Sequence, residues 1–283
     1  EYWGRISYLK GGVLLSDAVT TVSPRYAQEI QTSAFGFGFE GIMRARADAL
    51  VGILNGIDDA EWNPATDPHL SKPFDVAHLA AKRHTKRHVL ETYGLPADKP
   101  ALSRPLVGMI SRMVDQKGLD IIAHVADRLP HLGASFVVLG TGEPRYEAMW
   151  RSLAASHPGV VAVRVGFDEA LAHQIEGGAD MFLMPSRFEP CGLNQMYSLR
   201  YGTVPIVHAV GGLADTVEDV DASSEQGTGF VLRDYSGEAL LDALGRALAL
   251  YKDTHAWARL QRRGMARDFS WDASAKEYVK VYE

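Results

Sequence analysis

The chain has 283 residues, of which 46% are hydrophobic and 23% charged, enough apolar material for one large globular domain or two of ordinary size. Its formal net charge of −6 argues against a nucleic-acid binder, which should show a basic excess or stripe, although it leaves room for a local cationic pocket. A single cysteine, Cys191, excludes an intramolecular disulfide and fits a reducing compartment.

The first hundred residues are less regular than the rest. Residues 17–23 (DAVTTVS) and 49–56 (ALVGILNG) have strand character. Residues 55–75 are rich in Pro and Asp and indicate a linker or hinge. A helix with a strongly basic face is expected over 77–94.

From about residue 104, short apolar runs alternate with segments of helical spacing. Strands of four to seven apolar residues between helices indicate a parallel sheet covered on both faces, so the fold class is α/β with a doubly wound sheet. The strands are expected at 105–111, 135–140, 160–166, 180–186, 204–210 and 229–232. The helices are expected at 118–130, 145–155, 169–176, from about 192, from about 213, at 237–251, and at 269–283 with Ser270 as N-cap and Asp272 in the first turn.

Chemically useful residues directly follow several of these strands. Arg112 and Lys117 follow the first strand, Gly140 and Gly142 of the turn GTGEP follow the second, and Phe167 follows the third. Ligands of doubly wound sheets bind beyond the carboxyl ends of the strands. Cations, glycine-rich turns and helix N-termini suit a diphosphate, and an aromatic ring suits a base, so the combination predicts a nucleotide-diphosphate site.

Each of these features also has a structural interpretation that needs no ligand. GTGEP is also typical of a tight strand-to-helix turn. An Arg–Lys pair is also typical of a solvated surface, and a lone Phe is typical of core packing. Glu189, between the strand at 180–186 and the next helix, is either a site residue or an acid favoured near a helix N-terminus. Their occurrence together at successive strand ends favours the site.

No metal site, nucleophile or membrane span is expected. The ten histidines show no metal-ligand spacing with carboxylates or cysteine, and His84 and His88, although at i, i+4, are assigned to a solvated basic face. Cys191 has no evident base and is expected to be a small buried residue. No stretch approaches 18 consecutive apolar residues.

The segment PSRFEPCGLNQMYSLRYGTVPIVHAVGGLADTV (185–217) closely resembles the glycogen/starch synthases. The resemblance implies a GT-B fold of two Rossmann-like domains. It also implies retaining transfer of glucose from ADP-glucose to the non-reducing end of an α-1,4-glucan, without a metal or other cofactor. Further segments resemble that family in the same order along the chain, at 17–30, 52–70, 111–120, 140–147, 178–190 and 269–272.

The resemblance also implies roles for individual residues. Arg112 and Lys117 match the pair that holds the diphosphate and the charge of the leaving group, and Glu189 matches the glutamate that faces the donor glucose. The remaining matches are Cys191, Gly192 and Leu193 in the loop that meets the donor, Asn194 at a phosphate contact (Thr in most of the family), Phe167 against the adenine (Tyr in most of the family), Gly140 and Gly142 in the nucleotide-sugar site, and Asn55 near the acceptor.

The N-terminal part departs from the family. Residues 9–15 (LKGGVLL) look like the family's donor-binding loop but run directly into SDAVTTVSP, which belongs to the last third of the N-terminal domain. The sequence also shows neither an initiator Met nor a signal peptide, so the chain is expected to begin inside a longer protein and to lack most of that domain, including the family's catalytic His and Asp. The expected parts are a remnant of the N-terminal domain (1–50), a hinge (51–75), the nucleotide-sugar-binding domain (76–265) and a helix that crosses back (266–283).

Two other functions stay open beside the glucan synthase. The chain is alternatively a nucleotide-binding module without catalysis, or another GT-B enzyme such as a sucrose- or trehalose-type transferase or a sugar-nucleotide epimerase. The expected partners are ADP-glucose, the glucan and the missing N-terminal domain, with neither nucleic acid nor membrane. The resemblance favours ADP- over UDP-glucose and a bacterial cytoplasm, with a plastid as the alternative, and the sequence leaves the oligomeric state open.

Overall fold

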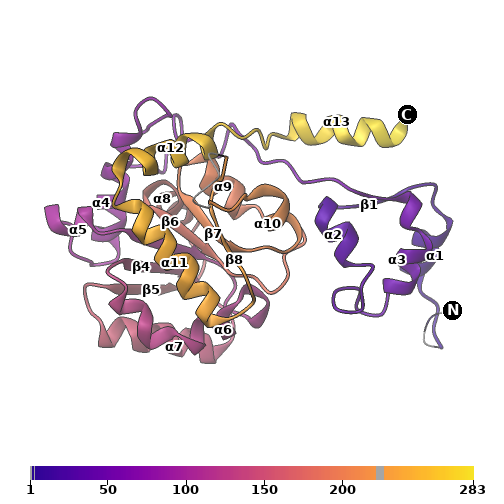
Figure 1. Ribbon diagram of the computed structural model, residues 1–283, viewed down its shortest axis with the longest axis horizontal. Coiled ribbons are helices and arrows are strands. Elements are labelled where there is room, and N and C mark those ends of the chain that lie inside the picture. Colours follow the sequence, from indigo (N-terminus) through magenta and orange to yellow (C-terminus); the bar gives the residue numbers. More distant parts are fainter. Residues whose placement is uncertain (1, 3, 221–225) are drawn as a thin grey trace.

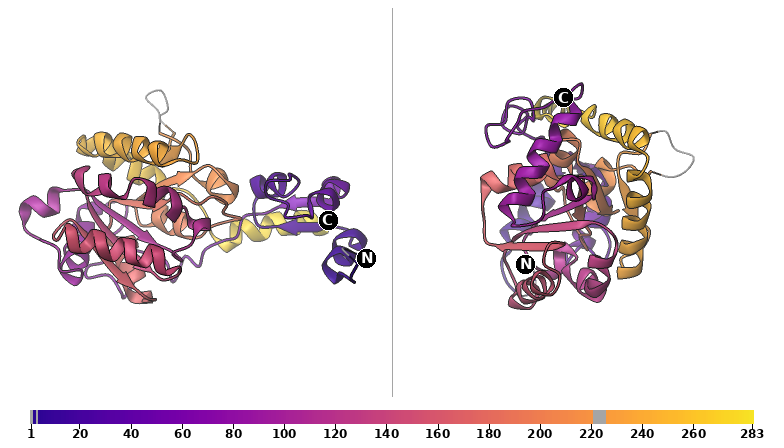
Figure 2. Two further views of the ribbon diagram at one scale, coloured as in Figure 1. Left: turned by 90° about the horizontal axis from the view of Figure 1, so that it is seen from below. Right: turned by 90° about the vertical axis from the view of Figure 1, so that its left-hand side faces the viewer.

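The computed structural model describes residues 2, 4–220 and 226–283. They form a large α/β body and a small body, built from residues up to 52, that a narrow waist joins (Figures 1 and 2). Two segments run in parallel through the waist, and the Ile57 N–H donates to the Phe269 carbonyl there (2.8 Å). Within the described residues, no helix combines the length and the apolar character that crossing a bilayer requires.

The large body is built on a six-stranded, wholly parallel sheet of order β5-β4-β3-β6-β7-β8. β3 lies between β4 and β6, so the strand order reverses at β3, which is where doubly wound folds bind ligands. All six predicted strands are confirmed. They are β3 (Leu106–Ile110), β4 (Ser135–Gly140), β5 (Val161–Val165), β6 (Met181–Met184), β7 (Val204–His208) and β8 (Phe230–Leu232).

Helices cover both faces of this sheet. In β4, Phe136 and Val138 pack with one set of helices (α6, α7, α11, α12), and Val137 and Leu139 pack with the other (α4, α5, α8, α10). Burial on both faces explains why the strands read as continuous apolar runs. The helices are α4 (Lys82–Thr92), α5 (Lys99–Ser103), α6 (Leu119–His124), α7 (Pro144–Ser156), α8 (Glu169–Gly178), α9 (Asn194–Arg200), α10 (Gly211–Thr216), α11 (Gly237–Tyr251) and α12 (Thr254–Met265), with 3-10 turns at Leu79–Ala81, Asp115–Lys117 and Ala126–His131.

One expectation about a helix is wrong, and some helices were not expected. The single helix predicted over 118–130 is two elements, because Pro130 has no N–H to continue the α-helical pattern and the chain tightens into a 3-10 turn over Ala126–His131. Helices α5 and α12 of the large body lie outside every helix that the sequence predicted. By contrast, Ser270 caps α13 (Trp271–Tyr282) as expected, since its hydroxyl accepts from the Ala273 N–H.

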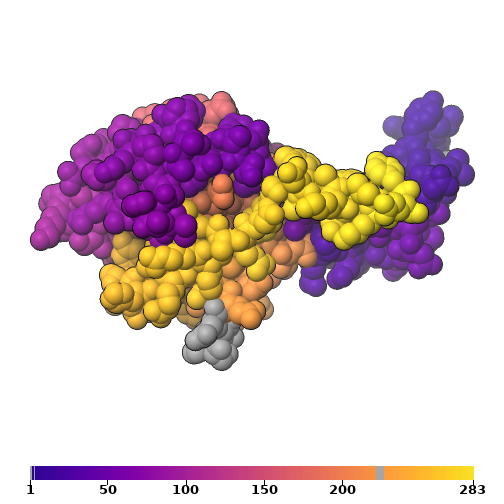
Figure 3. All heavy atoms as spheres, turned by 90° about the horizontal axis from the view of Figure 1, so that it is seen from above, coloured from indigo at the N-terminus to yellow at the C-terminus, as the bar shows by residue number. Residues whose placement is uncertain are grey.

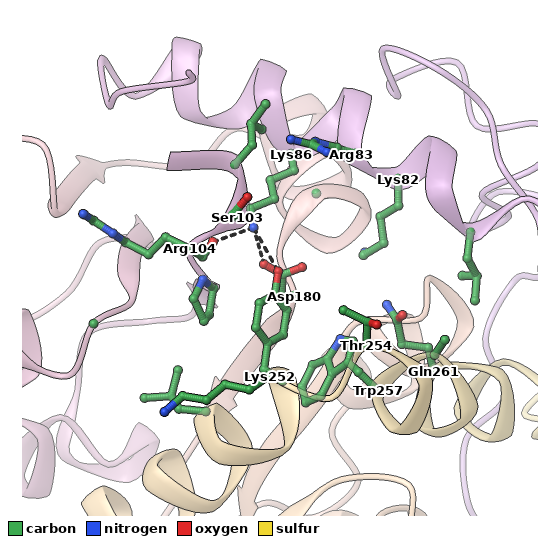
Figure 4. Close-up of a pocket in the computed structure, with 18 of the residues that line it drawn as sticks. Lys82, Arg83, Lys86, Ser103, Arg104, Asp180, Lys252, Thr254, Trp257 and Gln261 are labelled. Carbon is green, nitrogen blue, oxygen red and sulfur yellow. Dashed lines mark hydrogen bonds and ion pairs between the residues drawn. The ribbon is translucent and has the colours of Figure 1, made fainter. Parts of the chain in front are cut away.

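The basic face expected on the helix at 77–94 is only partly a solvated face. His84 is exposed, but Lys82 and Lys86 are buried. The Lys82 Nζ lies within hydrogen-bond distance of three backbone carbonyls and of Thr203 Oγ1, and burial lowers the pKa of Lys82 to about 7. Lys86 donates to Asp180 Oδ2 (2.6 Å). Both lysines line a cavity of about 1240 Å³ beyond the amino ends of β3 and β6 (Figure 4).

The small body contains two parallel strands and three short helices. Helix α2 packs on α10 of the large body, where Ser23 Oγ donates to Asp215 Oδ2 (2.6 Å) and the Glu29 carboxylate accepts from the Gly211 N–H (3.0 Å). Helix α13 extends from the large body over the small one (Figures 1 and 3). The elements are α1 (Tyr8–Leu15), β1 (Val19–Thr21), α2 (Pro24–Glu29), α3 (Glu40–Ala45), a 3-10 turn (Ala47–Ala49) and β2 (Leu50–Gly52). The expected limits of the domains stay a prediction.

Candidate active site

A cavity of about 470 Å³ opens at the carboxyl edge of the sheet, beside the reversal point at β3. The loops after β3, β4, β5 and β6, the start of α9 and residue 55 of the waist all reach it. Of the predicted site residues, only Gly142 does not line it: Gly142 bridges to Met113 and donates to Glu147 Oε1 (3.1 Å). The others are Asn55, Arg112, Lys117, Gly140, Phe167, Glu189, Cys191, Gly192, Leu193 and Asn194.

Glu189 is buried at the floor of this cavity. Lys117 Nζ donates to Glu189 Oε2, and Ser186 Oγ donates to the same oxygen (3.0 Å). The Glu189 side chain is 8% exposed and that of Lys117 is 19% exposed, so the ion pair is partly screened from solvent yet open to the cavity. A charge held in this way is preorganised for a ligand, because it needs little reorganisation when the ligand binds.

Close backbone approach brings the Lys117 turn to the loop that carries Glu189. Gly118 has φ +79°, and a Cβ there would meet the Pro185 carbonyl oxygen at 2.1 Å, so only glycine fits. The Arg187 N–H donates to the Gln116 carbonyl (2.9 Å), which fastens the two loops together. Arg112 is exposed at the rim, where it donates to Gln116 Oε1 (2.9 Å).

The start of helix α9 forms another wall. The first N–H groups of a helix lack partners within the helix, and they attract anions. The Asn194 side chain donates to the Ile110 carbonyl (3.1 Å), so it ties the helix start to the end of β3. Cys191 is buried as expected, and burial raises the pKa of its thiol. Cys191 therefore suits packing rather than nucleophilic attack.

Phe167 stands at the mouth of the cavity with 88% of its surface exposed. This position excludes the alternative that Phe167 packs in the core. Asp168 follows it and caps α8 by accepting from the Leu171 N–H (2.9 Å), which fixes the backbone beside the ring. A large, exposed aromatic ring on a fixed support at a cavity mouth is suited to stacking on a base.

Gln195 is a positioning residue that the sequence analysis missed. It is fully buried, and its Nε2 lies within hydrogen-bond distance of the carbonyls of Cys191 and Gly192 (3.1 Å each) and of Thr216 Oγ1 (3.2 Å). It thereby holds the loop that carries Glu189 against α10. The only sequence signal for this role was its position directly after the predicted site residue Asn194. The neighbouring sequence does not indicate which groups a glutamine amide in a helix will bond to.

Comparisons with known families agree with this architecture. A family model described as "Glycosyl transferases group 1" matches residues 97–263, and one described as "Starch synthase catalytic domain" matches residues 1–45. The fold is that of a GT-B glycosyltransferase, as the sequence predicted. The chain belongs to the group 1 glycosyltransferases.

Within this family, the chain is similar to glycogen and starch synthases. The chain is 54% identical to the glycogen synthase of Koribacter versatilis and 53% identical to that of Paracidovorax citrulli, in each case over 283 residues and 100% of the chain, but over only 58% and 55% of those proteins. The catalytic domain of starch synthase IV from Arabidopsis thaliana, bound to ADP and acarbose, superposes with a TM-score of 0.89 at 40% identity, covering 97% of this chain and 57% of that one. The predicted resemblance to glycogen/starch synthases is confirmed, and the chain spans somewhat more than half the length of these relatives.

Proposed function

We propose that the protein transfers glucose from ADP-glucose to the non-reducing end of an α-1,4-glucan, with retention of configuration. The observation that carries the proposal is the cavity itself. It brings together groups from loops that lie far apart in the sequence. These groups are two cationic side chains, a buried carboxylate, the start of a helix and an exposed aromatic ring. The similarity to bacterial glycogen synthases, and to a starch synthase structure that holds ADP and acarbose, supports this substrate pair.

In this proposal the adenine stacks on Phe167 and the diphosphate lies between the start of α9 and the two cations. Lys117 and Arg112 offset the charge that develops on the diphosphate as the glycosidic bond breaks. The helix start at residues 192–194 contributes backbone N–H groups to the same oxygens. The positive charge that the leaving group needs thus comes from the protein, so the proposal assigns no part to a metal or other cofactor.

Glu189 faces the transferred sugar in this proposal. Its carboxylate, fixed by Lys117 and Ser186, stabilises the oxocarbenium-like charge on the glucose ring and orients the sugar hydroxyls. Asn55 lies on the waist side of the cavity, where the acceptor chain would enter. Rotation of the small body on the large one, about the waist at residues 50–60 and the contact between α2 and α10, would exclude water from the reacting sugar.

The remaining N-terminal domain is the proposed packing partner of the small body and of α13. Four large apolar side chains in these two elements and beside them are mostly exposed: Ile6 (82%), Tyr8 (90%), Leu15 (86%) and Tyr282 (85%). Large apolar side chains on one region of a protein mark an interaction surface. We place the protein in the bacterial cytoplasm, with a plastid as the alternative, on the strength of its bacterial relatives and its single cysteine.

The test is incorporation of radiolabelled glucose into glycogen by this chain and by the full-length protein, with ADP-glucose or UDP-glucose as the donor. We expect the full-length protein to elongate the glucan from ADP-glucose, and the product to be degraded by a glucanase specific for α-1,4 linkages. Failure of the full-length protein to transfer glucose from either donor would refute the proposal.

A second candidate is that this chain alone is a nucleotide-binding module without catalysis. It is favoured because the chain spans only 58% of a relative such as the Koribacter enzyme. Calorimetry with ADP separates the two candidates. Binding of ADP without elongation by this chain supports the module, whereas elongation by this chain refutes it.

A further inference from the structure

His173 on helix α8 is a buried histidine that the glucosyl-transfer site does not use. It is 1% exposed, and its Nδ1 lies 2.8 Å from Asp67 Oδ2. The same oxygen accepts from the Tyr201 hydroxyl (2.6 Å), and Asp67 Oδ1 accepts from the His69 N–H (2.8 Å). Asp67 is therefore a fixed carboxylate acceptor, and it selects the tautomer of His173 in which Nδ1 carries the proton.

The other ring nitrogen, Nε2, then presents a lone pair. It is buried and has no hydrogen-bond partner within the part of the chain that the structure describes. A buried polar atom without a partner costs free energy and calls for a ligand. The Trp62 indole stacks on the imidazole at 3.7 Å between ring centroids and 12° between planes, and Tyr197 stacks on Trp62 at 3.7 Å. The stack prevents the imidazole from turning away.

Two carboxylates meet at this histidine. Glu169 precedes His173 by one turn of α8, and Glu61 precedes Trp62 in the waist segment. One ligand atom from each of Glu61, Glu169 and His173 lies within 4.8 Å of the other two. Glu61 is held by its turn, because Asp58 Oδ1 accepts from its N–H (3.1 Å).

This cluster has the donors of a metal site and an unbalanced charge. Across residues 2, 4–220 and 226–283, neither glutamate forms an ion pair with a Lys, Arg or His side chain. Two carboxylates at short range repel each other, and a cation between them removes that repulsion. The sequence offers a matching signal that was overlooked, because Glu169 stands four residues before His173.

We propose that Glu61, Glu169 and His173 Nε2 bind one divalent transition-metal ion, with Zn²⁺ as the ion that fits best. Imidazole together with carboxylates suits zinc, whereas Mg²⁺ and Ca²⁺ prefer shells of oxygen alone. Asp67 accepts the hydrogen bond from the other ring nitrogen of His173, as a carboxylate often does at a metal-bound histidine, and thereby orients the ring. The ion would fasten the waist segment to α8, the helix that begins two residues after Phe167.

The first test is calorimetric titration of ZnCl₂ into the 283-residue chain, its Glu61→Gln and Glu169→Gln variants, and Asp59→Asn as a matched control. Asp59 is an exposed acid two residues from Glu61 and is not a member of the cluster. We expect one Zn²⁺ per chain for the wild type and the control, and a Kd raised at least about tenfold in each glutamine variant. MgCl₂ should not bind at the same concentrations. Unchanged zinc affinity in either glutamine variant would overturn the proposal, as would absence of binding to the wild type.

The second measurement reports on His173 itself. Replacing His173 would remove one of the hydrogen bonds of the buried Asp67 carboxylate and destabilise the fold, so the wild-type chain is observed instead by ¹⁵N NMR of its histidine rings. Zinc should shift the His173 Nε2 resonance, which the glutamine variants help to assign, while Nδ1 keeps its proton. A shift confined to other histidines would mean that zinc binds elsewhere, and would equally overturn the proposal.

Discussion

The two edges of the central sheet each carry a lysine–carboxylate pair, and the pairs differ in what surrounds them. At the amino edge, Asp180 Oδ2 accepts from Lys86 and from the Leu106 N–H, and Lys86 also donates to the Arg104 carbonyl (Figure 4). At the carboxyl edge, the Glu189 carboxylate accepts from Lys117 and Ser186 and borders the cavity.

The difference shows how one chemical pair takes two roles. The amino-edge pair ties α4 and the ends of two strands together, and both of its members also bond to backbone groups, the Arg104 carbonyl and the Leu106 N–H. The carboxyl-edge pair joins two loops, and the further hydrogen bond of its carboxylate comes from a side chain, the Ser186 hydroxyl. Both pairs border a cavity, so the bonds to backbone are what fixes the amino-edge pair in the fold, whereas the carboxyl-edge pair is available to a ligand. Four changes test this distinction, from the largest expected effect to the smallest.

Glu189→Ala in the full-length protein should lower turnover by about two to three orders of magnitude, because it removes a preorganised charge from the transferred sugar. The free energy of unfolding should change by less than about 1 kcal/mol, since Lys117 is left facing the cavity, where water reaches it. Initial rates of glucose transfer and urea unfolding measure the two effects. Turnover near the wild-type value would contradict the role assigned to Glu189.

Asp180→Asn, the matched change at the amino edge, should reverse this pattern. It leaves the Lys86 ammonium buried without its counter-charge, which typically costs about 3–5 kcal/mol of stability. The affinity for ADP should stay unchanged, because the proposed nucleotide site lies in the other cavity, at the carboxyl edge of the sheet. If urea unfolding gave a loss below about 1 kcal/mol, the structural role of this pair would have to be abandoned.

Phe167→Ala should weaken ADP binding without affecting the fold. Stacking of a base on an aromatic side chain contributes about 1–3 kcal/mol, so Kd should rise roughly 5-fold to 150-fold. The ring is 88% exposed, so its removal should leave the unfolding transition in place. Phe167→Tyr is the control and should retain the wild-type Kd in calorimetry. Equal Kd values for the alanine variant and the wild type would show that the adenine does not stack there.

Glu176 offers a smaller, pH-dependent test of the buried charges near Lys82. Burial raises the pKa of Glu176 from 4.5 to about 8, so at intermediate pH the folded chain holds a proton that the unfolded chain has released. Its contribution to stability is therefore complete below pH 4.5 and is lost as the pH rises through about 8. The slope is at most about 1.4 kcal/mol per pH unit.

Glu176→Gln removes this titration and should flatten the curve. Urea unfolding between about pH 5 and pH 6.5, below the pKa of Lys82, isolates the effect of Glu176. The wild type should lose stability relative to the variant as the pH rises, because only the wild type titrates at this position. Parallel curves would indicate that Glu176 is already ionised in the fold.

The sequence alone determined the sheet and most of the cavity. Strand and helix patterns are local, because apolar periodicity depends on neighbours within one or two turns, and all six strands followed from it. The residues of the cavity followed because parallel strands end at one edge, so that side chains far apart in sequence, such as Lys117 and Glu189, meet there.

Only the tertiary structure decided how individual polar side chains are used. No residue close in sequence explains why Lys82 and Lys86 are buried. Their hydrogen-bond acceptors, backbone carbonyls for Lys82 and Asp180 for Lys86, lie about a hundred residues further along the chain. The same holds for Gln195 beneath the active-site loop, and for His173, whose partner Asp67 lies 106 residues away in sequence. Burial and hydrogen bonding of a polar group depend on what the completed fold places beside it, and periodicity carries no information about such distant contacts.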